Sequence, residues 1–324
     1  MADKANKLLE VRNLTIHYQT EDGLVKALND ASIEIGVGET LGLVGETGAG
    51  KTTLAKGIMG LIPKPPGKII SGEIIYDDRD LLQIGAEAMR TIRGGHISMI
   101  FQDPMTSLNP VLTIGEQILE VILQHNQIPA AKARMMAEEM LERVGIPADR
   151  FAEYPHQFSG GMKQRVVIAI ALACNPRLLI ADEPTTALDV TIQAQVLDMI
   201  HKLKAENNTS MILITHDLGV VAQNCDKVAI IYAGEIIEYG SLREIYKNTK
   251  HPYTLGLFGS IPSLTSEVRR LQAIDGMMPD PANLPDGCKF AQRCRRVQAD
   301  CTERNPKMTA TGTDHMVRCF HYDE

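Results

Sequence analysis

The chain of 324 residues contains no tryptophan, and only 4% of its residues are aromatic. Its longest apolar run, residues 166–174, is about half as long as the 18 or so residues that a membrane-spanning helix needs. The first residues lack the apolar core of a signal peptide, so we expect the protein to be made and kept in the cytosol. Acidic residues outnumber basic ones, 40 to 33, and this balance does not favour a nucleic-acid-binding protein.

Through about the first 250 residues, short apolar segments alternate with segments of helical spacing. The apolar run 40–44 leads into a glycine-rich loop, and a helical pattern follows from Lys51 to Leu61. A strand, a loop and a helix in this order form the opening unit of a parallel α/β sheet. Further strands are expected at 9–18, 25–35, 69–76, 96–101, 178–181 and 211–215, with a closing hairpin at 227–231 and 235–239. Further helices are expected at 114–144, 166–173 and 192–206.

The character of the sequence changes after about residue 250, where prolines become frequent and periodicity fades. Four of the six cysteines fall in this last part of the chain. We therefore expect a cassette at 1–247, a linker of irregular structure at 248–285 and a small cysteine-rich C-terminal module at 286–324. At roughly 100–200 residues per domain, the length suits one large domain or two modest ones.

The glycine-rich loop matches the Walker A pattern at every fixed position. Glycines let the backbone turn tightly, so that successive N–H groups point at phosphate oxygens, and the following helix adds its positive dipole end. Lys51 is expected to reach the β- and γ-phosphates, and the Thr52 hydroxyl to bind Mg²⁺. The loop expected to bind ATP consists of Gly45, Glu46, Thr47, Gly48, Ala49, Gly50, Lys51, Thr52 and Thr53.

Two acids, Asp182 and Glu183, end the apolar segment 178–181. The carboxyl ends of strands are where parallel α/β sheets bind their ligands. We expect Asp182 to hold Mg²⁺, directly or through water, and Glu183 to orient the attacking water as a general base. An Asp-Glu pair alone is most often a solvated surface pair, but its place after a buried strand and downstream of a phosphate loop favours this functional role.

Further motifs resemble those of the ATP-binding-cassette (ABC) ATPases and occur in that family's order. Residues 158–165, with the sequence FSGGMKQR, resemble the family's signature. Gln102 resembles the Q-loop glutamine, residues 187–189 resemble the D-loop, and His216 resembles the switch histidine. Tyr18 is placed like the aromatic residue on which adenine stacks.

The resemblance covers about residues 8–245 and implies the α/β fold of an ABC-type P-loop NTPase cassette. Such a cassette has a RecA-like core, an antiparallel β subdomain and a helical subdomain, here at about 103–177. The resemblance also implies that Gln102 contacts Mg²⁺ and that Gln102 and His216 act in catalysis with Glu183. Through the signature it implies nucleotide contacts from Ser159, Gly160, Gly161 and Gln164.

In this family the signature faces the γ-phosphate held by the phosphate loop of a partner cassette. A chain with one loop and one signature cannot complete either site, so a second ABC ATPase subunit is implied, and the resemblance favours a distinct one in a heterodimer. Two transmembrane permease subunits would dock near Gln102 and residues 103–160, and an external binding protein would deliver the solute. The chain would then lie peripherally on the cytoplasmic face of the cell membrane, with no nucleic-acid partner.

Residues 101–110, with the sequence FQDPMTSLNP, resemble the extended Q-loop of dipeptide, oligopeptide and nickel importers. The C-terminal cysteines resemble those of the D-type ATP-binding subunits of the same subfamily. The resemblance therefore implies an ATPase that powers uptake of di- or oligopeptides. The alternatives are a nickel importer subunit and a soluble ABC ATPase that moves no solute; the single cassette without sustained heptads disfavours the second.

In that subfamily four cysteines hold a [4Fe–4S] cluster, and the matching residues here are Cys288, Cys294, Cys301 and Cys319. Four thiolates can also bind Zn²⁺, but short zinc sites favour closer cysteine pairs, so the longer gaps favour the wider cluster, in a structural role. Arg295 stands where the subfamily usually has proline. We expect His315 and His321 to be ordinary surface histidines, and Cys174 and Cys225 to be packing residues.

Overall fold

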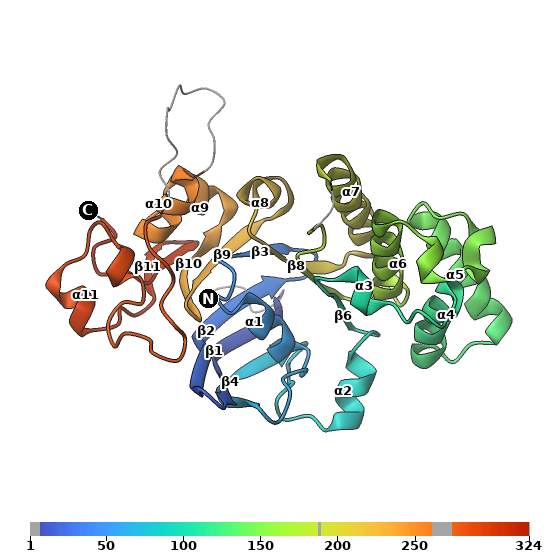
Figure 1. The fold of residues 1–324 in the computed structure, drawn as a ribbon, viewed down its shortest axis with the longest axis horizontal. Helices are drawn as coiled ribbons and strands as arrows, with labels where there is room; N and C mark the ends of the chain where they lie inside the picture. The colour runs from blue at the N-terminus through green and yellow to red at the C-terminus, as the bar shows by residue number, and fades with distance from the viewer. Residues whose placement is uncertain (1–6, 187–188, 261–273, 324) are drawn as a thin grey trace. The chain divides into compact units, whose positions relative to one another are not determined.

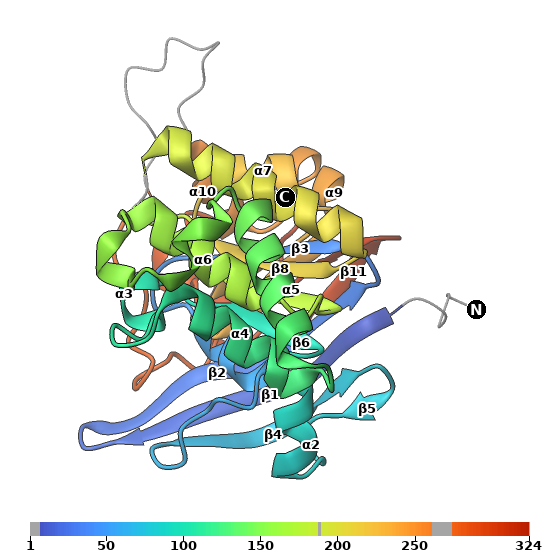
Figure 2. The same ribbon diagram turned by 90° about the vertical axis from the view of Figure 1, so that its right-hand side faces the viewer.

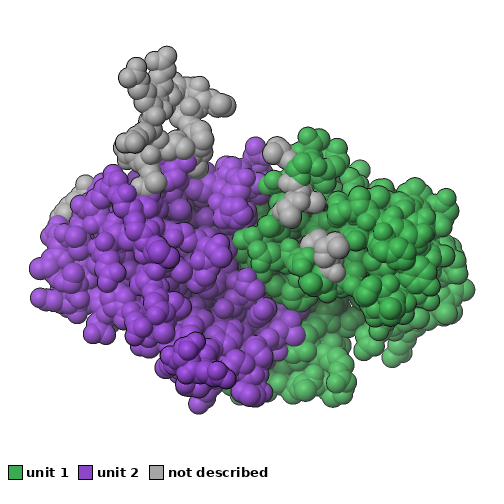
Figure 3. Space-filling view, in the orientation of Figure 1, with its two compact units in different colours: residues 1–8, 36–40, 83–214 green, residues 9–35, 41–82, 215–324 purple. Residues whose placement is uncertain are grey.

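The computed structural model describes residues 7–186, 189–260 and 274–323 (Figure 1). These residues form two compact units, each assembled from segments far apart in the sequence (Figure 3). Ala187 and Leu188 of the predicted D-loop lie outside the described residues. The described residues of the first unit are 7–8, 36–40, 83–186 and 189–214, and those of the second are 9–35, 41–82, 215–260 and 274–323.

A parallel sheet forms the centre of the first unit. Its strands lie in the order β8 (Ser210–Thr215), β7 (Leu178–Asp182) and β6 (Ile97–Ile100). Every residue of these strands is buried. Strands that are buried on both faces are apolar along their length, which is why short apolar runs predict them. The three strands expected in this part of the chain are confirmed.

Helices make up most of the remainder of the first unit. The helical pattern at 114–144 is divided into α4 (Ile114–His125) and α5 (Ala130–Arg143), with Pro129 in extended backbone before α5. A capping box begins α4: the hydroxyl of Thr113 accepts from the N–H of Glu116, and the Glu116 carboxylate accepts from the N–H of Thr113. Figure 2 shows α4 and α5 beside α6. The other helices of this unit are α2 (Ala86–Ile92), α3 (Pro104–Ser107), α6 (Gly160–Leu172), α7 (Val190–Asn207), η2 (Ala148–Ala152) and η3 (Pro155–Gln157).

The second unit contains an antiparallel sheet in the order β2-β1-β4-β5. In β1, the buried side chains Leu9 and Val11 are two positions apart, and so are Leu14 and Ile16. Between Val11 and Leu14 the spacing is three positions. The register with β4 shifts between residues 12 and 16. A β-bulge adds one residue in this way and keeps the following side chains on the core face. The strands are β1 (Lys7–Thr20), β2 (Gly23–Gly36), β4 (Gly67–Tyr76) and β5 (Arg79–Asp80).

Further strands of the second unit lie in the order β11-β12-β10-β9-β3. Strand β9 runs parallel to β3 and antiparallel to β10. Between β9 and β10, Ala233 and Gly234 have φ of 46° and 81°, as the two central residues of a tight hairpin turn require. The predicted closing hairpin is therefore confirmed. The strands are β3 (Thr40–Val44), β9 (Lys227–Tyr232), β10 (Glu235–Ser241), β11 (Thr309–Gly312) and β12 (His315–Val317).

The helices of the second unit are short and connect or cover its strands. None of the helices in the described ranges of either unit is long and apolar enough to cross a membrane. The helices are α1 (Lys51–Ile58), α8 (Leu218–Asn224), α9 (Leu242–Lys247), α10 (Pro252–Gly259), η4 (Ala291–Arg293) and α11 (Ala299–Glu303).

The sequence does not predict β11, β12 or α10. Strand β12 pairs with β10 and places His315 opposite Gly240. This register brings Nε2 of His315 to 2.8 Å from a carboxylate oxygen of Glu238, and the two side chains are 2% and 0% exposed. The expectation that His315 is a surface histidine is therefore wrong, because strand pairing sets it beside a buried carboxylate.

Replacing His315 with alanine should destabilise the protein. The carboxylate of Glu238 also accepts hydrogen bonds from the N–H groups of Lys250 and His251, at 2.7 and 3.1 Å. Loss of the imidazole leaves a buried carboxylate short of one partner, which costs about 3 kcal/mol of the free energy of unfolding. Urea denaturation of the full chain measures this, with the exposed His156→Ala as a control that changes by less than about 0.5 kcal/mol. Equal stability of H315A and wild type would contradict the prediction.

Candidate functional site

The phosphate loop, residues 45–53, joins β3 to α1 in the second unit. At Gly45 the backbone lies so close to β9 that a Cβ would be 2.2 Å from the carbonyl oxygen of Ile231. Gly50 has φ of 107° and is the N-cap of α1, with no side chain capping that helix. Both positions require glycine, one for space and the other for its left-handed backbone. The first N–H groups of α1 therefore meet no capping side chain that would compete with a phosphate.

Lys51 points into the loop that precedes it. Its ammonium group donates to the carbonyl oxygens of Gly45 and Glu46, at 2.8 and 3.1 Å, and the residue is 6% exposed. Thr52 and Thr53 follow it, half-buried, in the first turn of α1. The loop thus brings an ammonium group and the start of a helix to the same place, an arrangement that binds phosphate.

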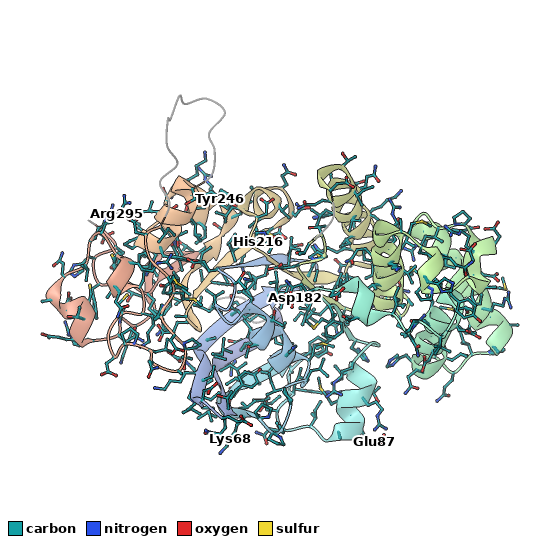
Figure 4. The ribbon with its side chains drawn as sticks, in the orientation of Figure 1. Lys68, Glu87, Asp182, His216, Tyr246 and Arg295 are labelled. Atoms are coloured by element: carbon teal, nitrogen blue, oxygen red, sulfur yellow. The ribbon has the colours of Figure 1, made fainter. Side chains whose placement is uncertain are left out.

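Gln102, Asp182 and Glu183 lie at the carboxyl end of the parallel sheet of the first unit. Asp182 is the last residue of β7 and is 2% exposed (Figure 4). Gln102 follows β6, and its amide donates to Oε2 of Glu183 at 3.0 Å. The hydroxyl of Thr186 donates to the same oxygen at 2.9 Å. The structure therefore brings the predicted Q-loop glutamine and the predicted general base into direct contact.

Glu183 has an unusual backbone conformation, with φ of 49°. For a residue with a side chain, this left-handed region costs about 1–2 kcal/mol. Its N–H donates to the carbonyl oxygen of Ile214 at 2.9 Å, and its carboxylate is held by Gln102 and Thr186. Strained backbone persists where the surroundings hold it, and it clusters at functional sites. These contacts fix the direction of the carboxylate before any substrate binds.

The predicted signature forms the start of α6. Ser159 is its N-cap, and the hydroxyl of Ser159 accepts from the N–H of Met162 at 3.4 Å. Ser159 and Gly160 are exposed, and a Cβ at Gly160 would meet no atom within 4 Å. Gln164 differs, since only 2% of this residue is exposed. In the described chain, Ser159 and Gly160 are therefore accessible to an external molecule, and Gln164 is buried within its unit.

The remaining predicted residues are Tyr18, His216 and Asp189. Tyr18 is half-buried in β1 beside Gly67, where a Cβ would lie 2.9 Å from the tyrosine ring. His216 directly follows β8 and is exposed (Figure 4). Asp189 is the predicted D-loop residue that the structure describes, and its carboxylate caps α7 by accepting from the N–H of Ile192 at 3.0 Å.

The four C-terminal cysteines, Cys288, Cys294, Cys301 and Cys319, line one pocket in the second unit. The pocket is also lined by Phe290 and His321, and it is partly open to solvent. Burial raises the pKa of Cys288 to about 12, and it also raises the pKa values of Cys294 and Cys319. Such thiols stay protonated at neutral pH unless a metal stabilises the thiolate.

The ligand atoms that lie close together in this region come from a mixed group of side chains. Within the described residues, one ligand atom each from Asp300, Cys301 and His321 lies within 4.8 Å of the other two. No three cysteines of the described chain form such a group. Tetrahedral zinc, with Zn–S bonds of about 2.3 Å, needs sulfurs roughly 3.8 Å apart. As they lie, the cysteines alone do not form such a compact set, whereas the ligand atoms of Asp300, Cys301 and His321 are close enough together for a single metal ion.

Comparison with known proteins assigns the chain to a family. Residues 28–186 match the ABC transporter family, and residues 237–301 match the C-terminal region of oligopeptide/dipeptide transporters. The dipeptide transport ATP-binding protein DppD of Bacillus subtilis is 47% identical over 320 residues, which cover 98% of this chain and 96% of that protein. The chain belongs to the ABC transporter family. The oligopeptide transport ATP-binding protein OppD of Salmonella typhimurium is also similar, with 46% identity over 98% of this chain and 94% of that protein.

Solved ABC cassettes agree with this assignment. The dimeric structure of the ATP-binding cassette MJ0796 in a post-hydrolysis state, bound to ADP and Pi, matches with a TM-score of 0.66 and 28% identity, over 72% of this chain and 99% of that one. The structure of cbiO1 from Clostridium perfringens, part of the transporter complex cbiONQ, matches with a TM-score of 0.64 and 27% identity, over 75% and 92%. The predicted ABC ATPase and its α/β cassette fold are confirmed.

Three residues near these ABC sites were not predicted from the sequence. Thr186 holds Glu183, but nothing in its residue type distinguishes it from an ordinary turn threonine. Asp300 and His321 hydrogen-bond to each other at 2.9 Å, and His321 lines the cysteine pocket, although 21 positions separate the two residues. A single carboxylate beside a cysteine is too common a pattern to predict a ligand group; here it is the fold that brings the two residues together.

Proposed function

We propose that the chain is the ATP-hydrolysing subunit of an ABC importer that takes up dipeptides or oligopeptides across the cytoplasmic membrane. The observation that carries this proposal is the nearly full-length similarity to peptide-transport ATP-binding proteins, which includes the C-terminal region. A cassette alone would not require that region, since the solved cassettes match only about three quarters of the chain. A nickel importer shares the cassette and is the second candidate.

ATP binds with its phosphates on the loop 45–53 and its adenine against Tyr18. Lys51 exchanges the two carbonyl oxygens of the loop for the β- and γ-phosphates, because a hydrogen bond between two charged groups is stronger than one to a neutral carbonyl. Thr52, Gln102 and Asp182 are the residues of this chain suited to hold Mg²⁺ or its water ligands. When bound, the ion neutralises charge on the phosphates.

Hydrolysis is in-line attack by water on the γ-phosphorus. Glu183 orients the water and takes its proton, the bond from the γ-phosphorus to the β-γ bridging oxygen breaks, and ADP and phosphate leave. The held direction of the Glu183 carboxylate supports this role. His216 contacts the γ-phosphate, and the buried Gln164 supports the signature helix rather than meeting nucleotide directly.

The signature residues Ser159, Gly160 and Gly161 act on the nucleotide held by a second ABC ATPase subunit. The exposure of Ser159 and Gly160 at the start of α6 supports this role. The second subunit is a distinct chain, and the pair drives two permease subunits, with an external binding protein delivering the peptide. The chain works peripherally on the cytoplasmic face of the membrane.

The four cysteines of the C-terminal pocket hold a [4Fe–4S] cluster. The donor set supports it: four thiols line one pocket, and among the described residues no three of their sulfurs all lie within 4.8 Å of one another. When bound, the cluster supplies cross-links among loops that are rich in proline and poor in regular structure. Zinc is the alternative ligand for the same thiols.

Replacing Glu183 with glutamine should leave ATP binding in place and slow hydrolysis by about 100-fold or more, because an amide cannot take the proton. Phosphate release by the assembled complex measures the rate, and nucleotide retention measures binding. The matched control is Glu87→Gln on α2, a side chain that is 90% exposed (Figure 4). Hydrolysis at the wild-type rate would remove Glu183 from its proposed role.

The full chain, purified without oxygen, should contain about four iron atoms per molecule, as the formula of the cluster requires. Cys301→Ser should lower that iron content. The control is Cys174→Ser, since Cys174 lies outside the pocket and contacts the carbonyl oxygen of Val121. Metal analysis decides the outcome: one zinc and no iron would replace the cluster with a zinc site.

Purification from membranes should recover this chain with two permease subunits and a second, different ATPase subunit. Cells that lack the chain should fail to take up labelled di- or oligopeptides, and wild type but not E183Q should restore uptake. Loss of nickel uptake alone would favour the nickel importer. Absence of any membrane partner would favour a soluble ABC ATPase.

A further inference from the structure

Arg293, at the end of η4 between Cys288 and Cys294, contacts the phosphate loop within the second unit. Its Nη1 donates to both carboxylate oxygens of Glu46, at 2.9 and 3.1 Å, although 247 positions separate the two residues. The side chains of Arg293 and Glu46 are 6% and 32% exposed. Solvent screens such a pair less than a surface pair, so its loss has a larger effect.

Several other contacts fix the direction of the Arg293 guanidinium. Its Nε donates to the carbonyl oxygen of Asp275 at 2.9 Å, and its Nη1 also lies 3.3 Å from the hydroxyl of Tyr232. The guanidinium is a rigid, planar fork, so a backbone acceptor on one side determines where the other side points. In this structure the other side of the guanidinium contacts Glu46. The segment that contains Asp275 also approaches the phosphate loop, since the methyl carbon of Met278 lies 3.4 Å from where a Cβ of Gly48 would be.

Glu46 is linked by its own backbone to the group that meets phosphate. Its N–H donates to the hydroxyl of Tyr253 at 3.2 Å, and its carbonyl oxygen accepts from Lys51 at 3.1 Å and from the N–H of Ala49 at 3.1 Å. Burial raises the pKa of Tyr253, so this hydroxyl stays protonated. A displacement of Glu46 would therefore also displace the carbonyl that holds Lys51.

The charge of Glu46 opposes the proposed ligand of the loop. A carboxylate beside a triphosphate repels it, and an unpaired carboxylate would also compete with the phosphates for Lys51. Arg293 cancels this charge and holds the carboxylate toward the C-terminal segment. The phosphate loop tolerates glutamate at position 46 because Arg293 neutralises its charge. Arg293 belongs to residues 286–324, the cysteine-bearing segment.

We propose that Arg293 is a positioning residue for ATP: by pairing with Glu46 it holds the phosphate loop ready for nucleotide, so that ATP affinity depends on the cysteine-bearing C-terminal segment. The inference rests on the proposed nucleotide site and adds a long-range determinant of its affinity.

The test is the dissociation constant for Mg-ATP of the full chain, measured with the midpoint of thermal unfolding of each variant. Arg293→Gln should raise the dissociation constant by roughly 3- to 30-fold. Arg295→Gln is the matched control, because it removes the same charge from the same segment. Arg295, labelled in Figure 4, is 68% exposed, and it pairs with Asp275 at 3.2 Å. Its loss should therefore leave the dissociation constant unchanged.

A second-site variant separates positioning from a merely structural role. In the double variant Glu46→Gln with Arg293→Gln, the unpaired carboxylate is absent, so the dissociation constant should return toward the wild-type value. Glu46→Gln alone is the reference for this comparison, because it removes the carboxylate charge and keeps an amide oxygen that can accept from Arg293. Arg293→Lys keeps the charge but loses the fork, and its affinity should fall between those of wild type and R293Q.

Three results would overturn the proposal. The first is an R293Q chain that binds Mg-ATP as tightly as R295Q. The second is an R293Q chain that binds Mg-ATP more weakly and unfolds at a lower temperature, and whose binding is not restored by adding Glu46→Gln. That result would show general destabilisation. The third is a wild-type chain that fails to bind Mg-ATP, which would refute the nucleotide site itself and this inference with it.

Discussion

Strand β9 is the element on which the phosphate loop and the cysteine-bearing segment both depend. The carbonyl oxygen of Ile231 occupies the place that a side chain at Gly45 would need, so it sets how closely the loop approaches the sheet. The ring of the next residue, Tyr232, packs on Tyr253 and Phe290, with centroids 4.7 and 5.3 Å apart. Close-packed interiors transmit displacement because they compress little. The match between the loop and a phosphate therefore depends on how these rings are held.

The C-terminal segment is tied into the second unit by contacts that need no metal. Arg318 donates to the carbonyl oxygen of Ile236 at 3.2 Å and pairs with Asp30 at 3.1 Å, and only 7% of its side chain is exposed. Asn305 donates to Glu235 at 2.7 Å, and burial raises the pKa of that carboxyl group. Together with the pairing of β12 and β10, these contacts place the ends of the segment. A bound cluster would then have to order only the loops between the cysteines.

What the sequence predicted well is what local chemistry determines. The strands β7 and β8 are continuous apolar runs, the turn at Ala233–Gly234 needs left-handed backbone, and the phosphate loop needs glycine at two places. Strand β11 consists of threonine, alanine and glycine without apolar alternation, so no period predicts it. The pairs His315–Glu238 and Arg293–Glu46 join residues 77 and 247 positions apart. Family resemblance supplies motif residues in order, but contacts of this range arise only from the folded topology.

The start of α6 supports the proposed second subunit. A side chain at Gly160 would meet nothing within 4 Å, so the packing of the chain itself does not require glycine there. Glycine at position 160 is required if an external group approaches the backbone closely. An anion attracted to the partial positive charge of the helix start is such a group. The chain carries one phosphate loop and one such helix start. A phosphate presented by the proposed second cassette has the chemistry to fill this position. The exposed glycine is therefore best explained by a role in a second subunit's nucleotide site.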